Sequence, residues 1–143
     1  MAIRDLRLRE AKPSDRPHIL LWDTPKDLEL RQLAYSENAE CISYRTHLLK
    51  RIADQNSPFL ALHMRLDREL NSIKAICAET DKPLVIFKDL DRLITYLCVQ
   101  PESPITLFWQ NLLNTRHLES ILWILLPSKL SPPNWDESRI KRI

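Results

Sequence analysis

The sequence contains no glycine, although a chain of 143 residues with average composition would hold about ten. Glycine allows positive φ angles and lets the backbone approach a phosphate without a Cβ in the way. Its absence excludes the P-loop GxxxxGK[ST], the dinucleotide-binding GxGxxG, the protein-kinase glycine loop and the GxSxG nucleophile elbow. Ten prolines provide the turns and element boundaries instead. The chain therefore lacks the usual glycine-based devices for holding a nucleotide phosphate.

Cysteine pairs and long apolar runs are also missing. The three cysteines, Cys41, Cys77 and Cys98, form no CxxC pair, and the four histidines show no metal-ligand spacing. We expect free, buried thiols, a reducing cytoplasmic setting and no metal or other cofactor. The longest apolar run, Ile121 to Leu126, is far too short to cross a bilayer, and the first residues contain no signal-peptide h-region.

Short apolar strands alternate with amphipathic helices along the chain. Strands are predicted over residues 18–22, 40–44, 84–87 and 121–126, and helices over residues 25–35, 48–53, 58–79, 93–99 and 104–113. This alternation predicts one α/β domain over residues 1–143, with three layers and a mostly parallel sheet of about four strands covered by helices. Residues 1–16 are expected to form a charged N-terminal segment, and residues 127–143 a peripheral proline-rich, basic tail.

The first helix has a recognisable start. Thr24 is predicted as its N-cap with Pro25 at the first helical position. The apolar spacing predicts that Leu28, Leu30 and Leu33 are buried against the sheet.

Acidic residues follow two of the predicted strands. The segment Pro83 to Leu93, PLVIFKDLDRL, places Asp89 and Asp91 after an apolar strand, where P-loop NTPases hold the aspartate that reaches Mg²⁺. Lys88 lies beside them in the sequence, and its ammonium group would repel a metal cation. A helix-capping role for Asp89 is therefore the simpler interpretation. Asp23 and Lys26 follow the first strand, and carboxyl ends of parallel strands gather ligands. We keep all four as candidate strand-end residues without assigning a metal or a catalytic role.

The C-terminal segment offers a second set of candidates. Trp135 lies among prolines, and tryptophan is enriched at binding hot spots, so we expect it at a protein interface. Arg139, Lys141 and Arg142 add positive charge that would contact phosphates if the two termini meet. The net charge of the chain, only +2, does not by itself argue for nucleic acid or a membrane surface.

The order of these elements resembles a known family. The matching pieces are LLWDTPKDLELRQL, ECISY, PFLALHMRLDREL, PLVIFKDLDRL, FWQNLLN and ILWILLPSKL. They are similar to the BrxB accessory proteins of BREX anti-phage systems, which resemble P-loop NTPases that have lost the nucleotide-binding loop. The PLVIFKDLDRL piece also resembles the DDLDRL strand end of some signalling and defence ATPases, with Lys88 at the first aspartate. The resemblance implies a P-loop-NTPase-like fold without the P-loop, and no functional residue is carried over.

Three functions are consistent with these features of the sequence. The first is a non-catalytic accessory or adaptor subunit that contacts protein partners in a larger bacterial complex, in phage defence if the resemblance holds. The second is a divergent metal-dependent nucleotide hydrolase or nuclease that uses Asp23, Asp89 and Asp91. The third is a nucleic-acid-binding module that uses the basic ends of the chain.

Overall fold

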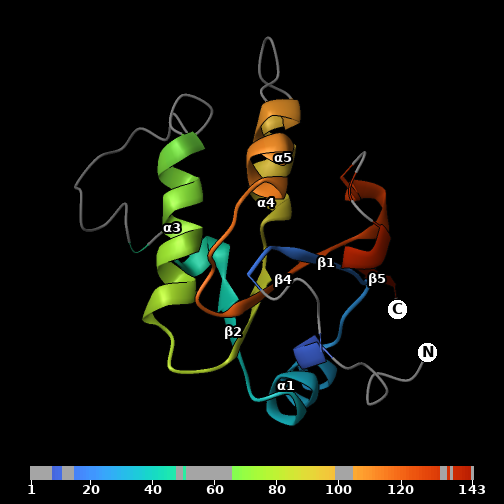
Figure 1. Ribbon diagram of the computed structural model, residues 1–143. Coiled ribbons are helices and arrows are strands. Elements are labelled where there is room, and N and C mark those ends of the chain that lie inside the picture. Colours follow the sequence, from blue (N-terminus) through green and yellow to red (C-terminus); the bar gives the residue numbers. More distant parts are fainter. Residues whose placement is uncertain are drawn as a thin grey trace.

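The computed structural model describes residues 8–10, 15–47, 50, 66–98, 105–132, 135 and 137–142. The elements whose bounds are described are five strands, four helices and three short 3-10 helices, labelled η, and Figure 1 shows how they are arranged. The elements in chain order are η2 (Leu8–Glu10), β1 (His18–Leu21), α1 (Asp27–Ser36), β2 (Ala39–Ser43), α3 (Leu66–Glu79), β3 (Leu84–Lys88), α4 (Asp91–Cys98), α5 (Ile105–Leu113), β4 (Ile121–Leu126), η4 (Ser128–Leu130), η5 (Glu137–Arg139) and β5 (Ile140–Arg142). Of the expected helix over 48–53 the structure describes only residue 50, which is helical, and the beginnings expected at 58 and 104 lie outside the described residues.

The strands form one parallel sheet in the order β2-β3-β4-β1-β5. Leu84, Val85, Ile86 and Phe87 of β3 pair with consecutive residues of β4, which in turn pairs with β1. The predicted α/β class and the mostly parallel sheet are therefore confirmed. The prediction of four strands is one short, because β5 adds an edge strand beside β1.

Alternating residues of each inner strand supply two separate cores. Val85 and Phe87 face α3, α4 and α5, whereas Leu84 and Ile86 face α1 and η2. Because both faces of the sheet are covered, the inner strands are apolar throughout rather than alternately polar. Figure 1 shows the result, with α3, α4 and α5 on one side of the sheet and α1 on the other. The domain has the expected three layers.

The chain meets its need for positive φ angles without glycine. Among the described residues, Asn38, Asp89 and His117 have φ angles of 53°, 67° and 64°. Asn38 follows the end of α1, at a position where helices commonly use a left-handed residue, and asparagine tolerates this conformation better than most residues. Asp89 immediately follows β3, so the backbone turns sharply at the very residue that the sequence marks as a candidate.

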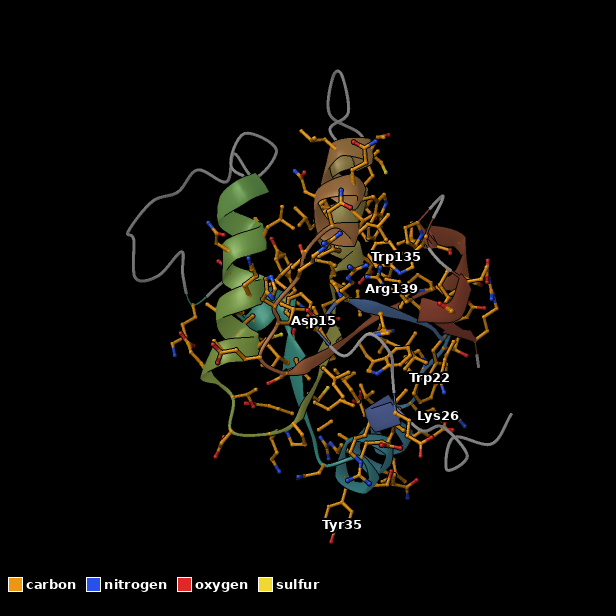
Figure 2. The ribbon with its side chains drawn as sticks, in the orientation of Figure 1. Asp15, Trp22, Lys26, Tyr35, Trp135 and Arg139 are labelled. Carbon is orange, nitrogen blue, oxygen red and sulfur yellow. The ribbon has the colours of Figure 1, made fainter. Side chains whose placement is uncertain are left out.

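The C-terminal segment is not peripheral. Trp135 is only 5% exposed and packs in the core beside Trp109, with ring centroids 6.1 Å apart. Arg139 is 3% exposed, and its Nε and Nη2 donate hydrogen bonds of 3.0 and 2.5 Å to the carbonyl oxygen of Pro17. The Arg139 guanidinium also lies 5.1 Å from the centre of the Trp135 ring. A buried guanidinium must satisfy its donors, and the Pro17 carbonyl oxygen accepts from two of them. These contacts hold the C-terminal segment against the start of β1 (Figure 2).

The beginning of α1 also differs from the prediction. Lys26, not Thr24, occupies the N-cap position, and its carbonyl oxygen accepts a hydrogen bond from the amide of Leu30. Asp27 is then the first helical residue, where its negative charge interacts favourably with the positive end of the helix dipole. Leu30 is buried as expected, but Leu28 is 66% exposed. The helical period explains this, because Leu28 lies on the opposite side of α1 from Leu30.

Candidate functional site

The carboxyl ends of the central strands open into a cleft. The helix after β1 packs on one face of the sheet, and the helix after β3 packs on the other. Ligand crevices of parallel sheets form where successive connections diverge in this way. A central cleft of about 280 Å³ lies there, and it is lined by Trp22, Asp23, Pro25, Asp27, Leu30, Lys88, Asp89, Asp91, Leu125, Leu126 and Pro127.

The structure brings three of the four strand-end candidates together. Asp23 lines the central cleft from the end of β1, Asp89 from the end of β3 and Asp91 from the start of α4. Lys26 is exposed, belongs to the start of α1 and does not line this cleft.

Asp23 is held by the segment that follows β4. Its Oδ1 accepts hydrogen bonds from the backbone amide of Ser128 at 2.7 Å and from the Ser128 hydroxyl at 2.6 Å. The side-chain bond, the backbone bond and the charge of Lys129 lower the pKa of the Asp23 carboxyl below its usual 3.8, against the opposing effect of desolvation. The carboxylate therefore fastens the end of β1 to the start of η4.

Asp89 is held by the neighbouring strand. Its Oδ2 accepts a hydrogen bond of 2.5 Å from the hydroxyl of Ser43, at the end of β2. This bond joins β3 to β2, and the helix-capping role expected for Asp89 stays a prediction beside it. Lys88 also lines the central cleft and brings a positive charge next to Asp89. Among the described residues, no group of three or more His, Cys, Asp or Glu side chains is arranged to hold a metal ion.

Two further clefts adjoin the central one. A basic cleft of about 630 Å³ shares Asp27, Leu30 and Lys88 with it. The described residues that line this cleft are Asp27, Leu30, Arg31, Ala34, Cys41, Ile42, Ser43, Thr46, His47, Lys50 and Lys88. An outer cleft of about 730 Å³ is lined by Asp23, Asp91, Thr95, Pro127, Lys129 and Leu130. The three clefts adjoin one another along the edge of the sheet that is formed by the carboxyl ends of its strands. The basic cleft could not be predicted from the sequence, because its cations come from separate elements and form no local motif.

The C-terminal cations do not form the expected open patch. Arg139 is buried against Pro17, and Arg142 makes a two-pronged ion pair with Glu137 at 3.0 and 3.3 Å. Lys141 is half-buried in β5. The cations at residues 4 and 7 lie outside the described residues. Trp135 likewise packs inside the domain and is not on its surface.

The cysteines are free, as expected, but only one of them is buried. Burial raises the pKa of the Cys77 thiol to about 12. Cys41 and Cys98 are exposed, so the expectation that all three are buried is wrong for these two.

The outer face of α1 carries two large exposed side chains. Tyr35 is 91% exposed and Leu28 is 66% exposed. They are seven residues apart, which places them on the same side of the helix, two turns from one another. Figure 2 shows Tyr35 pointing away from the body of the domain. The helix therefore uses Leu30, Leu33 and Ala34 for the core and leaves this second apolar pair uncovered.

Comparison with known proteins gives no lead of its own, since no family model, no curated protein and no solved structure matches this chain. Within the part of the chain that the structure describes, no helix is both long enough and apolar enough to cross a membrane.

Proposed function

We propose that this protein is a non-catalytic accessory subunit that binds a partner protein through the outer face of α1, defined by Leu28, Gln32 and Tyr35. The observation that carries the proposal is the exposure of Tyr35 and Leu28 on one side of a helix. Tyrosine is enriched at binding hot spots, because it buries a large rigid area and keeps a hydroxyl for hydrogen bonding. An amphipathic helix face with anchors two turns apart is a common mode of protein recognition.

The groups at the strand ends also support a structural role. Asp23 and Asp89 accept short hydrogen bonds from Ser128 and Ser43, which join neighbouring parts of the fold. After β1, where P-loop NTPases place their phosphate loop, the sequence reads Trp22-Asp23-Thr24-Pro25, and Pro25 has no amide hydrogen to offer an anion. The resemblance to BrxB accessory proteins supports an anti-phage complex as the setting of this subunit.

The test is capture of the partner from the host with an affinity-tagged chain expressed at native level. The variant Leu28→Glu/Tyr35→Glu should reduce the amount of captured partner by about tenfold or more, because burying each side chain contributes about 1.5 to 3 kcal/mol to the free energy of binding. The control is Leu107→Glu, which alters an apolar side chain of α5 that is 53% exposed on the opposite layer. Equal capture by wild type, variant and control would refute the proposal.

A metal-dependent hydrolase is the second candidate, favoured by one observation. Asp23, Asp89 and Asp91 line the same central cleft. Binding of Mg²⁺ should be measured by calorimetry for the wild type and for Asp89→Ala. Tight binding that the variant loses would support the hydrolase, whereas the accessory role predicts no such site, because Lys88 lies beside Asp89 and Ser43 occupies one of its oxygens.

A further inference from the structure

The basic cleft concentrates positive charge. Arg31, Lys50 and Lys88 line it, and among the described residues of its wall Asp27 is the one carboxylate. With His47 neutral, these side chains sum to a charge of +2, which equals the formal net charge of the whole chain. Among the described residues, no ion pair joins Arg31, Lys50 or Lys88 to a carboxylate. The three cations are therefore available to an anion from outside.

Each of these cations is placed by a different part of the fold. Arg31 comes from α1, Lys88 ends β3, and Lys50 follows the helical turn after β2. Ser43 at the end of β2 pairs with Lys88 at the end of β3, and residues of α1 line the same cleft. These two placements bring the three cations together. Ligands bind at the carboxyl ends of parallel strands for the same topological reason.

The remaining lining fits a small molecule with one charged and one apolar part. Thr46 adds a hydroxyl group to the lining, whereas the Ser43 hydroxyl is already donated to Asp89, and Leu30, Ala34 and Ile42 form an apolar wall. The volume of about 630 Å³ lies in the range of small-molecule sites, which is about 300 to 1,000 Å³. A guanidinium with nearby ammonium groups matches the geometry and charge of a phosphate. Without glycine, side-chain cations replace the backbone amides that usually cradle this group.

We propose that the basic cleft binds a small organic phosphate, with the phosphate held by Arg31, Lys50 and Lys88 and the uncharged part against Leu30, Ala34 and Ile42. This inference goes beyond the accessory role and does not rest on it, because the cleft and the outer face of α1 use different side chains. Loss of partner capture would leave it standing, and loss of phosphate binding would leave the accessory role standing.

Three probes separate the two halves of the site: phenyl phosphate, inorganic phosphate and phenol. Titrations followed by amide chemical shifts in NMR should give saturable binding of phenyl phosphate, with the largest shifts at residues 41–47 and at Lys88. Phenyl phosphate should bind more tightly than either other probe. Absence of saturable binding, or equal affinity for phenyl phosphate and inorganic phosphate, would overturn the proposal.

The matched variants decide whether binding is local. Arg31→Gln/Lys88→Gln should weaken phenyl phosphate binding by about tenfold or more, since charge-assisted hydrogen bonds are lost. Arg116→Gln/Lys74→Gln removes the same charge from exposed positions outside the cleft and should change the affinity by less than about twofold. Equal weakening by both double variants would show diffuse attraction and refute the site. If the first double variant does not fold, Arg31→Gln alone provides the comparison, because Arg31 is exposed.

Discussion

Substitution of Arg139 by alanine is the sharpest test of the structure at the C-terminal end of the chain. Arg139 is 3% exposed, donates hydrogen bonds of 3.0 and 2.5 Å to the Pro17 carbonyl, and stacks 5.1 Å from the Trp135 ring. The variant loses all three contacts and leaves the Pro17 carbonyl oxygen without these donors. The sequence alone predicts an exposed side chain here, and therefore almost no effect on stability.

The magnitude follows from these contacts. Hydrogen bonds to a charged group contribute about 1.5 to 3 kcal/mol, and a desolvated cation–π contact adds up to about 2 kcal/mol. Removing the charge also removes its desolvation cost, which offsets part of the loss. We expect Arg139→Ala to lower the free energy of unfolding by about 3 kcal/mol. For 143 residues the entropy of unfolding is about 0.3 kcal/mol/K, so Tm should fall by about 10 °C.

The assay is urea denaturation followed by tryptophan fluorescence, with calorimetry for Tm. Arg142→Ala is the control, because it removes the same charge from the same segment while its ion pair with Glu137 is exposed. It should melt close to the wild type. If Arg139→Ala also melts within about 2 °C of the wild type, the buried position of Arg139 is wrong.

Two further predictions concern backbone strain and pH. His117→Gly should raise the free energy of unfolding by about 1 kcal/mol relative to His117→Ala, because only glycine avoids the cost of a φ of 64°; urea denaturation of both variants measures the difference, and equal stabilities would contradict it. Hydrogen bonds from Ser128 lower the pKa of Asp23, so its contribution to stability is fully present above 3.8 and is lost as pH falls through the lower folded value. The Tm gap between wild type and Asp23→Asn should therefore shrink below pH 3.8, and a gap that widens in acid would refute this.

The fold class was predictable because its signals are local. The all-apolar runs at Leu84–Phe87 and Ile121–Leu126 indicate strands covered on both faces, and the structure places them side by side at the centre of the sheet. The strand order was not predictable, since it depends on pairings between residues far apart in the sequence. β5 escaped prediction because Ile140–Arg142 is short and charged, and its place is fixed by the buried contacts of Arg139.

The candidate site was predictable in part for the same reason. Asp23, Asp89 and Asp91 were found from their positions after strands, and the parallel sheet brings them to one cleft. The bonds of Asp23 to Ser128 and of Asp89 to Ser43 depend on strand order and had no local signal. Leu28 was misjudged because three leucines in α1 allow two choices of buried face. Choosing Leu30, Leu33 and Ala34 as the buried set would have identified the outer face of α1.

The most direct measurement is site-specific photo-crosslinking in the host cell. A photoreactive phenylalanine analogue placed at Tyr35 keeps the ring and reports what lies against it. The accessory role predicts one dominant cross-linked protein from this position and none from the same analogue at Lys74, an exposed residue of α3. Identical cross-links from both positions, or none from Tyr35, would contradict a partner on the outer face of α1.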